Sequence, residues 1–567
     1  MYCSYRINDV LEESMYNLSR FNLEYRVQQC LNFLNNCVDK KRGCLPYFAV
    51  MFKKDPAEVR HDWPDFSDLT ARYVEAFVFA RRMLKIKEAS AVELVLRKLL
   101  LSYFDEGDGL SYRPKPDKPY YSTILRREYA AHVAEGFDQA RVLWALLSWF
   151  EDTQDELIST KINELIAALD RVLVKKDDYG YYDRSTFEPS AKICHDAPPM
   201  PHQFYFCGTQ IHPLIECYRR LKNDKALELA SRLTNYIVYH SDYFLEDGTW
   251  NCPGGAGFES AEMDGHTHSR FATVAGIATV GIVTANQYLV KKMKVCYDWF
   301  VENHCSSFGW SPEFLGRFGD ADEGCETCAI MDQINCCFAF TEAGYPQYYE
   351  QVEKIARNQL LENQMLDTSL LRNTIEKPDT ELSCFHNIAD MVKGGFAGWA
   401  GVNDFIGNCD HHYCLMNCCG PAGTRALYDV YRNIYTIYDK KVYINIFMNR
   451  EDSNIRIESQ QPHIGQVEIT LKKSLEINIV KRSWFGKNVE FTIDNEPWEY
   501  TENNNYYILA SVPLNKEVVF KYGLCPKNED VHVNGRDFKV KWLGDTVMDI
   551  APKGKIMPMY IWREYVK

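Results

Sequence analysis

Residues 68–85 read DLTARYVEAFVFARRMLK. Leu69, Tyr73, Phe77 and Ala80 recur at helical spacing, so this stretch predicts an α-helix with one apolar stripe. Comparable stripes recur through the first three quarters of the chain and give about twelve predicted helices. The predicted helices cover residues 8–38, 68–85, 89–103, 136–150, 156–174, 210–222, 224–240, 266–288, 289–303, 327–342, 346–364 and 421–437.

Many of these helices follow one another in pairs, separated by short polar breaks such as Lys222-Asn223-Asp224. Paired helices in this number favour an (α/α)6 barrel over a small bundle. Irregular stretches this long are uncommon unless they carry function, so we expect them to form an aromatic-lined cleft at one end of the barrel. The long irregular stretches are residues 107–125, 176–208, 243–266, 304–326 and 366–417.

The pattern changes after about residue 438, where short alternating segments rich in β-branched residues begin, such as VEFTIDN at 489–495. Polar turns such as Asn534-Gly535 separate these segments. This spacing predicts an antiparallel β-sandwich. The predicted fold class is therefore mainly α with a β domain: a catalytic (α/α)6 barrel over 1–437, then a β-sandwich over 438–567.

The overall composition excludes several classes of protein. The net charge is -14 and no Lys/Arg-rich run occurs, which argues against a nucleic-acid partner. No apolar run approaches the length of a membrane helix, and the N-terminus lacks the pattern of a secretory signal. The 20 cysteines include two vicinal pairs, which without an export signal favours free or metal-bound thiols. We therefore expect a cytoplasmic protein without a membrane partner, and leave a homodimer as an open alternative.

Two short motifs supply metal-binding chemistry. Glu326-Thr327-Cys328 and Cys418-Cys419 each lie at the start of a predicted helix and at the end of a long irregular stretch. Three thiolates and one carboxylate are a complete tetrahedral shell for zinc. Taken separately, each motif also fits a helix-start glutamate favoured by the helix dipole or a pair of buried cysteines. The coincidence of the two motifs favours a metal site.

Five stretches, in order along the chain, resemble glycoside hydrolase family 127 and its relatives. The stretches are DFSDLTARYVEA (65–76), GTQIHPLIECYRRL (208–221), DGHTHSRFATVAG (264–276), GCETCAIMD (324–332) and NCCGPAGTRALYDVYRNIYTIYDKKVYINIFMN (417–449). The chain departs from the family where Gly-Pro-Ala follows the cysteine pair and where Trp310-Ser311 replaces a family histidine. The resemblance implies a retaining exo-glycoside hydrolase that releases terminal β-L-arabinofuranose.

The resemblance also implies roles for individual residues. It implies a zinc ion held by Glu326, Cys328, Cys418 and Cys419, with Cys418 as the nucleophile. The family's acid/base glutamate aligns with Glu313 in Ser-Pro-Glu-Phe, and the rival carboxylates are in the same loop. The rivals are Asp320, Asp322 and Glu323.

Four further side chains are expected to bind the sugar: His212, His266, His268 and Asp68. The alternative for each histidine is a hydrogen-bonded position in the core. Trp63 and Tyr205 are weaker candidates for the pocket, and His411-His412 are alternative metal ligands.

Three alternative functions stay open at this point. The first is a glycosidase of the same fold that acts on another unusual sugar. The second is an α/α-barrel polysaccharide lyase, which would use Tyr or His bases and no zinc. The third is a carbohydrate-binding barrel without catalysis.

Overall fold

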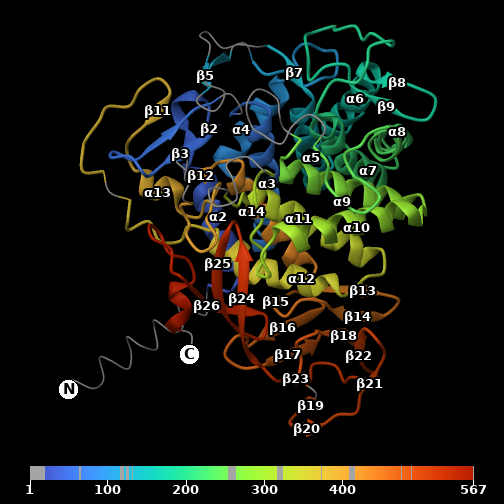
Figure 1. The fold of residues 1–567 in the computed structure, drawn as a ribbon, viewed down its shortest axis with the longest axis vertical. Coiled ribbons are helices and arrows are strands. Elements are labelled where there is room, and N and C mark those ends of the chain that lie inside the picture. The colour runs from blue at the N-terminus through green and yellow to red at the C-terminus, as the bar shows by residue number, and fades with distance from the viewer. Residues whose placement is uncertain are drawn as a thin grey trace.

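The computed structural model describes residues 20–62, 65–114, 120–122, 127–129, 132–252, 264–315, 324–371, 373–407, 415–473, 475–486 and 488–565. Its N-terminal part is mainly helical, and sheets follow it in the chain (Figure 1). Within these ranges, no helix combines the length and hydropathy that crossing a lipid bilayer requires.

Six helices pack on one another in sequence to form a closed ring. Each contacts the next, and the last returns to the first. The ring consists of α3 (Asp68–Leu84), α5 (Gly136–Thr153), α7 (Thr209–Leu221), α9 (Thr267–Val283), α11 (Thr327–Glu342) and α14 (Cys419–Arg432). α9 is buried from Thr267 through Gly281, as expected of a helix that is apolar on all sides. α7 and α9 approach each other closely at Gly276, where an added Cβ would lie 2.7 Å from the backbone nitrogen of His212.

Six more helices cover the ring from outside, each against one or two ring helices. They are α2 (Leu23–Asn36), α4 (Ala91–Ser102), α6 (Glu156–Val172), α8 (Asp224–Tyr239), α10 (Gln287–His304) and α12 (Tyr348–Ile355). In α6, Ile158, Ile162, Leu165 and Leu169 form the buried face that the apolar stripe predicts. The predicted helices are thus confirmed as elements of the fold, with ends that differ by a few residues. A short helix that the sequence did not predict, α13, covers Ile388–Val392.

One predicted helix is wrong at its C-terminal end. The stretch 421–437 was expected to be helical throughout, but α14 ends at Arg432 and Tyr435–Tyr438 forms strand β13. Tyr435 to Tyr438 are aromatic or β-branched, and they pair with β14. At the other end of the chain, the predicted helix 8–38 appears as α2, and residues before 20 lie outside the described ranges.

Very short strands tie the long loops together beside the ring. A four-stranded sheet has the order β11 (Ser383–Cys384), β4 (Glu58–Arg60), β3 (Ala49–Met51), β12 (Leu415–Met416). Strands of two or three residues leave no alternating pattern in a sequence, so none of them was predicted. Further short pairs join β1 (Val38–Asp39) to β2 (Leu45–Pro46), β5 (Tyr120–Ser122) to β6 (Arg127–Tyr129), β7 (Ala134–Glu135) to β10 (Thr186–Phe187), and β8 (Val174–Lys175) to β9 (Gly180–Tyr181).

The C-terminal strands form three sheets, two of which gather below the helices in Figure 1. The five-stranded sheet has the order β13, β14 (Lys441–Ile444), β18 (Glu476–Val480), β22 (Tyr506–Leu509), β21 (Thr501–Glu502). The six-stranded sheet has the order β15 (Arg450–Glu451), β16 (Ile455–Ser459), β17 (Gln466–Leu471), β23 (Glu517–Tyr522), β19 (Val489–Ile493), β20 (Glu496–Pro497). The third sheet is β24 (Pro526–Val533), β25 (Arg536–Leu543), β26 (Thr546–Ala551).

Strand pairing in these sheets is antiparallel with one exception. β14 and β18 run parallel, which the antiparallel arrangement predicted from the sequence did not include. A parallel pair requires a long crossover, and here the chain forms β15 to β17 of the other sheet before it returns. The 3₁₀ helix at Ile561–Tyr565 then packs back on the helical part, where Arg563 donates to Glu362 at 2.9 Å.

Candidate metal centre and reactive groups

Glu326 and Cys328 lie at the start of α11. Glu326 is the residue before the first helical turn and has extended backbone angles (φ -89, ψ 128), whereas Cys328 is already helical. This change of conformation lets both side chains face the same point, which two residues inside a regular helix cannot do. The segment is held in place because Cys325 and Ala400 exchange backbone hydrogen bonds of 2.7 and 3.1 Å.

Cys418 and Cys419 lie at the start of α14, as the sequence predicted. The preceding Asn417 fixes the approach, since its backbone N–H donates to Phe48 O at 2.7 Å and its side chain donates to Tyr47 O at 2.6 Å. Gly420 is required next to the pair, because a Cβ there would lie 2.1 Å from the ring of Phe33. The structure therefore brings two helix starts that are far apart in sequence to one place.

The four predicted ligands meet in a buried cluster. Their ligand atoms all lie within 4.8 Å of one another. Cys328 Sγ is 3.8 Å from Cys419 Sγ, Cys418 Sγ is 4.0 Å from Cys419 Sγ, and Cys418 Sγ is 3.7 Å from Glu326 Oε1. Ligands about 2.0–2.3 Å from a tetrahedral zinc ion lie about 3.3–3.8 Å apart. Glu326, Cys328, Cys418 and Cys419 are therefore close enough to hold a metal ion.

The electrostatics of the cluster favour a cation. Burial raises the pKa of the Cys328 and Cys419 thiols well above the ordinary value, and the neighbouring carboxylate and thiols add to this effect. Burial opposes the charge on Glu326, but His266, His268 and the Cys328 thiol together outweigh burial and lower the Glu326 pKa to about 2. The pocket therefore contains an ionised carboxylate beside thiols whose ionisation a bound cation would favour.

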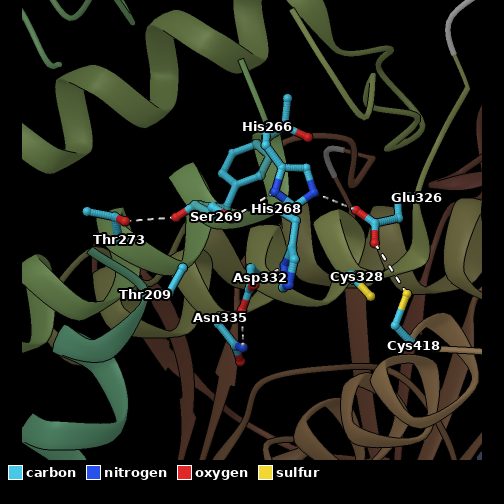
Figure 2. A network of polar contacts seen from close by, with 12 residues as sticks. Thr209, His266, His268, Ser269, Thr273, Glu326, Cys328, Asp332, Asn335 and Cys418 are labelled. Carbon is cyan, nitrogen blue, oxygen red and sulfur yellow. Dashed lines mark hydrogen bonds and ion pairs between the residues drawn. The ribbon is translucent and has the colours of Figure 1, made fainter. Parts of the chain in front are cut away.

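Glu313 and His266 lie beside this cluster and share Glu326 with it. Ligand atoms of His266, Glu313 and Glu326 lie within 4.8 Å of one another, and all three side chains are buried. His266 Nε2 is 3.4 Å from Glu326 Oε2, while its Nδ1 is hydrogen-bonded to Ser269 Oγ at 2.8 Å (Figure 2). The backbone of Glu313 is fixed on both sides, because its N–H donates to Gly324 O and its carbonyl accepts from Thr267 N–H.

His268 belongs to a buried polar network next to the cluster, where both of its ring nitrogens are occupied. Its Nε2 lies 2.7 Å from Arg141 Nη2 and 3.4 Å from Arg72 Nη2, and its Nδ1 lies 2.6 Å from Asp332 Oδ2. Guanidinium groups only donate, so Nε2 must be the acceptor and Nδ1 must carry the proton. Burial and the charge of Arg141 lower the pKa of His268 well below its ordinary value, which agrees with a neutral ring.

Arg72 joins this network to the sulfur of a predicted ligand. Its Nη1 donates to Cys328 Sγ at 3.7 Å, and its Nε donates to Asp68 Oδ1 at 2.6 Å. The Asp68 carboxylate therefore forms an ion pair with Arg72. Tyr205, a weaker candidate from the sequence, stacks on Phe137 with ring centroids 4.5 Å apart and lies 5.9 Å from the His266 ring. It sits in a π-helical turn over Phe204–Gly208, a distortion often found at functional sites.

His212 is the predicted site residue that the structure places elsewhere. It lines a separate pocket near the other ends of the ring helices, with its ring edge-on to Trp144 at a centroid distance of 5.0 Å. Its role as a sugar contact stays a prediction. The remaining candidates, Trp63, Asp320, Asp322, Glu323 and His411-His412, lie outside the described residues.

Three residues of the network were missed by the sequence reasoning: Arg72, Arg141 and Asp332. Two of them carry a weak signal, since Arg72 follows Asp68 by four positions and Asp332 follows Cys328 by four positions on predicted helices. Arg141 carries no such signal, because it comes from a helix that shares no motif with the others.

The two neutral histidines predict a loss of stability in acid. Burial lowers the pKa of His212 to about 4 and that of His268 well below its ordinary value, so the unfolded chain binds more protons than the folded chain between about pH 6.5 and 4. Their stabilising effect is complete above the unfolded pKa and is lost as the pH falls through the folded pKa, by up to about 1.4 kcal/mol per pH unit for each proton. Urea unfolding across this range should show the decline, and His212→Gln should make it shallower. An equally steep decline in the variant would contradict the assignment.

No protein-family model matches the chain, and no curated protein matches it. Solved structures do match. Ara127N, a GH127 β-L-arabinofuranosidase from Geobacillus stearothermophilus T6, superposes with a TM-score of 0.59 at 12% identity over 96% of this chain and 85% of that chain. A second GH127 β-arabinofuranosidase gives 0.58 at 12% identity over 94% and 82%. The fold is that of the GH127 β-L-arabinofuranosidases.

A third solved structure, described as a glycoside hydrolase, gives a TM-score of 0.53 at 16% identity over 92% of this chain and 87% of that chain. The resemblance to GH127 that the motifs predicted is therefore confirmed for the fold, across nearly the whole chain. At these identities the comparison establishes the fold alone, and the activity has to be argued from the site.

Proposed function

We propose that the protein is a retaining exo-glycoside hydrolase with Cys418 as its nucleophile and Glu313 as its acid/base. One observation carries the proposal: both groups lie beside the same buried carboxylate. Cys418 Sγ is 3.7 Å from Glu326 Oε1, and Glu313 lies within 4.8 Å of Glu326 and His266. Retaining hydrolysis needs a nucleophile and a proton donor close together around one anomeric carbon. A thiolate and a carboxyl group in this arrangement supply both.

The cluster would hold a zinc ion through Glu326, Cys328, Cys418 and Cys419. When bound, zinc would keep the Cys418 sulfur deprotonated at neutral pH despite burial, and so available as a nucleophile. His266 would orient Glu326, since a ring nitrogen of His266 lies 3.4 Å from the carboxylate. Arg72 would hold Cys328 through its contact with the sulfur.

The reaction would proceed in two displacements. First, Cys418 Sγ forms a bond to the anomeric carbon while the bond to the leaving-group oxygen breaks, and Glu313 gives its proton to that oxygen. The product of this step is a sugar joined to Cys418 by a thioether bond. Glu313, now ionised, then takes a proton from a water molecule whose oxygen attacks the anomeric carbon, and the carbon–sulfur bond breaks. Two inversions return the original configuration.

The substrate we propose is a terminal β-L-arabinofuranoside, because the site motifs and the fold resemble the enzymes that release this sugar. Gly-Pro-Ala after the cysteine pair and Trp310-Ser311 before Glu313 differ from the motifs of the family, so a related sugar is the alternative substrate. For the architecture, we propose that the helical ring is an (α/α)6 barrel over 1–437 and that the following sheets form a β-sandwich domain over 438–567.

A screen of aryl glycosides, with metal analysis of the same protein sample, tests this function. We expect hydrolysis of the aryl β-L-arabinofuranoside and about one zinc per chain, with both lost together after treatment with a strong chelator. Activity that is unaffected by complete removal of metal would contradict the proposed centre. A product that absorbs in the ultraviolet through a new double bond would instead identify a lyase. No turnover of any glycoside would favour a binding protein.

A further inference from the structure

A second polar pocket lies near the other ends of the ring helices and is lined by none of the four candidate metal ligands. The cluster and its network are built from the N-terminal halves of α3, α5, α9, α11 and α14, whereas most residues that α3, α11 and α14 give to this pocket lie in the C-terminal halves of those helices. Most of its remaining wall comes from α5, α7, α9, α12, β13, β14 and β22, with His212 among the residues of α7. Its volume of ≈ 670 Å³ is within the range of about 300–1,000 Å³ that is usual for ligand sites.

The wall of the pocket contains both signs of charge, already paired. Five arginines and four carboxylates line it. The pairs include Arg219 with Glu342 at 2.8 Å, Arg220 with Glu216 at 3.0 Å, and Arg432 with Asp429 at 2.9 Å. An anion would meet four carboxylates and compete with them for the arginines. A neutral ligand with many hydroxyl groups can instead donate to the carboxylates and accept from the guanidinium groups without breaking the pairs.

Several polar atoms in the wall have no hydrogen-bond partner among the described residues. They include the Oδ1 of Asn445 and the Nε of Arg425, two side chains that are more than nine-tenths buried. The Arg425 Nε also lies 3.6 Å from Asp429 Oδ2, in an ion pair. Neither ring nitrogen of His212 is hydrogen-bonded to any described residue. Burial lowers the His212 pKa to about 4, so its ring offers one donor and one acceptor at neutral pH. Buried polar atoms of this kind usually have a partner, and here the residues that carry them line one pocket.

The pocket also offers aromatic surface. Five tyrosines line it, from α12, α14 and the adjoining strands. Tyr443 and Tyr506 lie on the strand side, with ring centroids 5.4 Å apart. Tyrosine rings can pack against the C–H faces of a sugar ring while their hydroxyl groups form hydrogen bonds. Paired charges, unpartnered polar atoms and aromatic rings together match a polyhydroxylated ring compound.

We propose that this pocket is a second ligand site and that it binds a neutral molecule of the sugar class. His212, which the motif at 208–221 marked as a sugar contact, would then serve this site and not the metal cluster. This inference does not depend on the activity proposed for the cluster, because none of the proposed metal ligands and neither Cys418 nor Glu313 lines the pocket. The pocket adjoins the His268 network where Asn335 donates to Asp332 Oδ1 at 3.2 Å.

Calorimetric titration of the full-length protein with L-arabinose tests the proposal, with inorganic phosphate as the anionic probe. We expect His212→Phe to remove one arabinose site or to weaken it at least tenfold, and His212→Gln, which keeps a donor and an acceptor, to stay within about threefold of wild type. The measured quantity is the difference in arabinose binding between wild type and His212→Phe. Arabinose bound at the metal cluster contributes equally to both proteins and does not change this difference.

A second variant guards against a folding defect in the first. Tyr443→Trp fills the pocket from β14, where the side chain is only partly buried, and should also weaken arabinose at this site at least tenfold. Arabinose titrations that are identical in wild type, His212→Phe and Tyr443→Trp would overturn the proposal. Phosphate binding that depends on His212, with no arabinose binding, would also overturn it and identify an anion site.

Discussion

A Cys418→Ser variant is expected to lose at least about 10³-fold in kcat on an aryl β-L-arabinofuranoside. Serine differs from cysteine by one atom, so the fold should be kept. A hydroxyl group is far harder to ionise than a thiol and binds zinc less well, so the variant should lack a competent nucleophile. The measurement is steady-state release of the aryl alcohol by wild type and variant at matched protein concentration. Circular dichroism and the unfolding midpoint verify that the two proteins are equally folded.

The matched control for this variant is Cys337→Ser. Cys337 is also one of two vicinal cysteines and is also buried, but it lies in the middle of α11, where its sulfur is near Tyr297 Oη at 3.0 Å. We expect this variant to keep turnover within a few-fold of wild type. If Cys418→Ser also keeps wild-type turnover, Cys418 is not the nucleophile.

Glu313→Gln is expected to lower kcat/KM by about 10²–10⁴-fold, with the size of the loss set by the leaving group. Glutamine has the same shape as glutamate but cannot give a proton to the departing oxygen. A nitrophenolate leaves without that help, so its release should fall much less than that of an alkyl aglycone. The measurement is a series of aryl and alkyl glycosides with leaving groups of increasing pKa, compared between wild type and variant.

Azide provides the control for the second displacement. It attacks the sugar on Cys418 without needing a base, so it should restore turnover of the nitrophenyl glycoside in Glu313→Gln and yield a glycosyl azide of retained configuration. Azide should not stimulate wild type. A loss in rate that is the same for every leaving group, with no effect of azide, would show that Glu313 has only a structural role.

The helices were predictable because their apolar stripes repeat over many turns. Leu69, Tyr73 and Phe77 show the helical period directly, and they are buried in α3 as expected. The chain from Tyr435 to Tyr438 was misread, because four residues are too few to separate the end of a helix from a strand. The short strands β11 and β12 pair with β4 and β3, which lie hundreds of residues earlier in the chain, and no local pattern reveals such partners.

The candidate site was predictable where residue type alone limits the chemistry. Few roles suit two adjacent cysteines and a Glu-x-Cys at helix starts, and the structure brings all four side chains together. Arg72 and Arg141 were missed because arginines are common on helices, and only the packing of the ring shows that these two are buried against His268. The pocket that His212 lines was not predicted, since a motif identifies a residue but not its neighbours in the fold.

Peptide mass spectrometry of the trapped intermediate tests the central claim most directly. In Glu313→Gln, a nitrophenyl glycoside should release one equivalent of nitrophenol in a burst. The sugar should then stay on the enzyme, because water attacks it slowly without the base. Acid quenching and proteolysis should then yield the Cys418-Cys419 peptide with one added pentosyl group, located on the Cys418 sulfur. An unmodified cysteine peptide after such a burst, or the sugar attached to a carboxylate, would contradict a cysteine nucleophile.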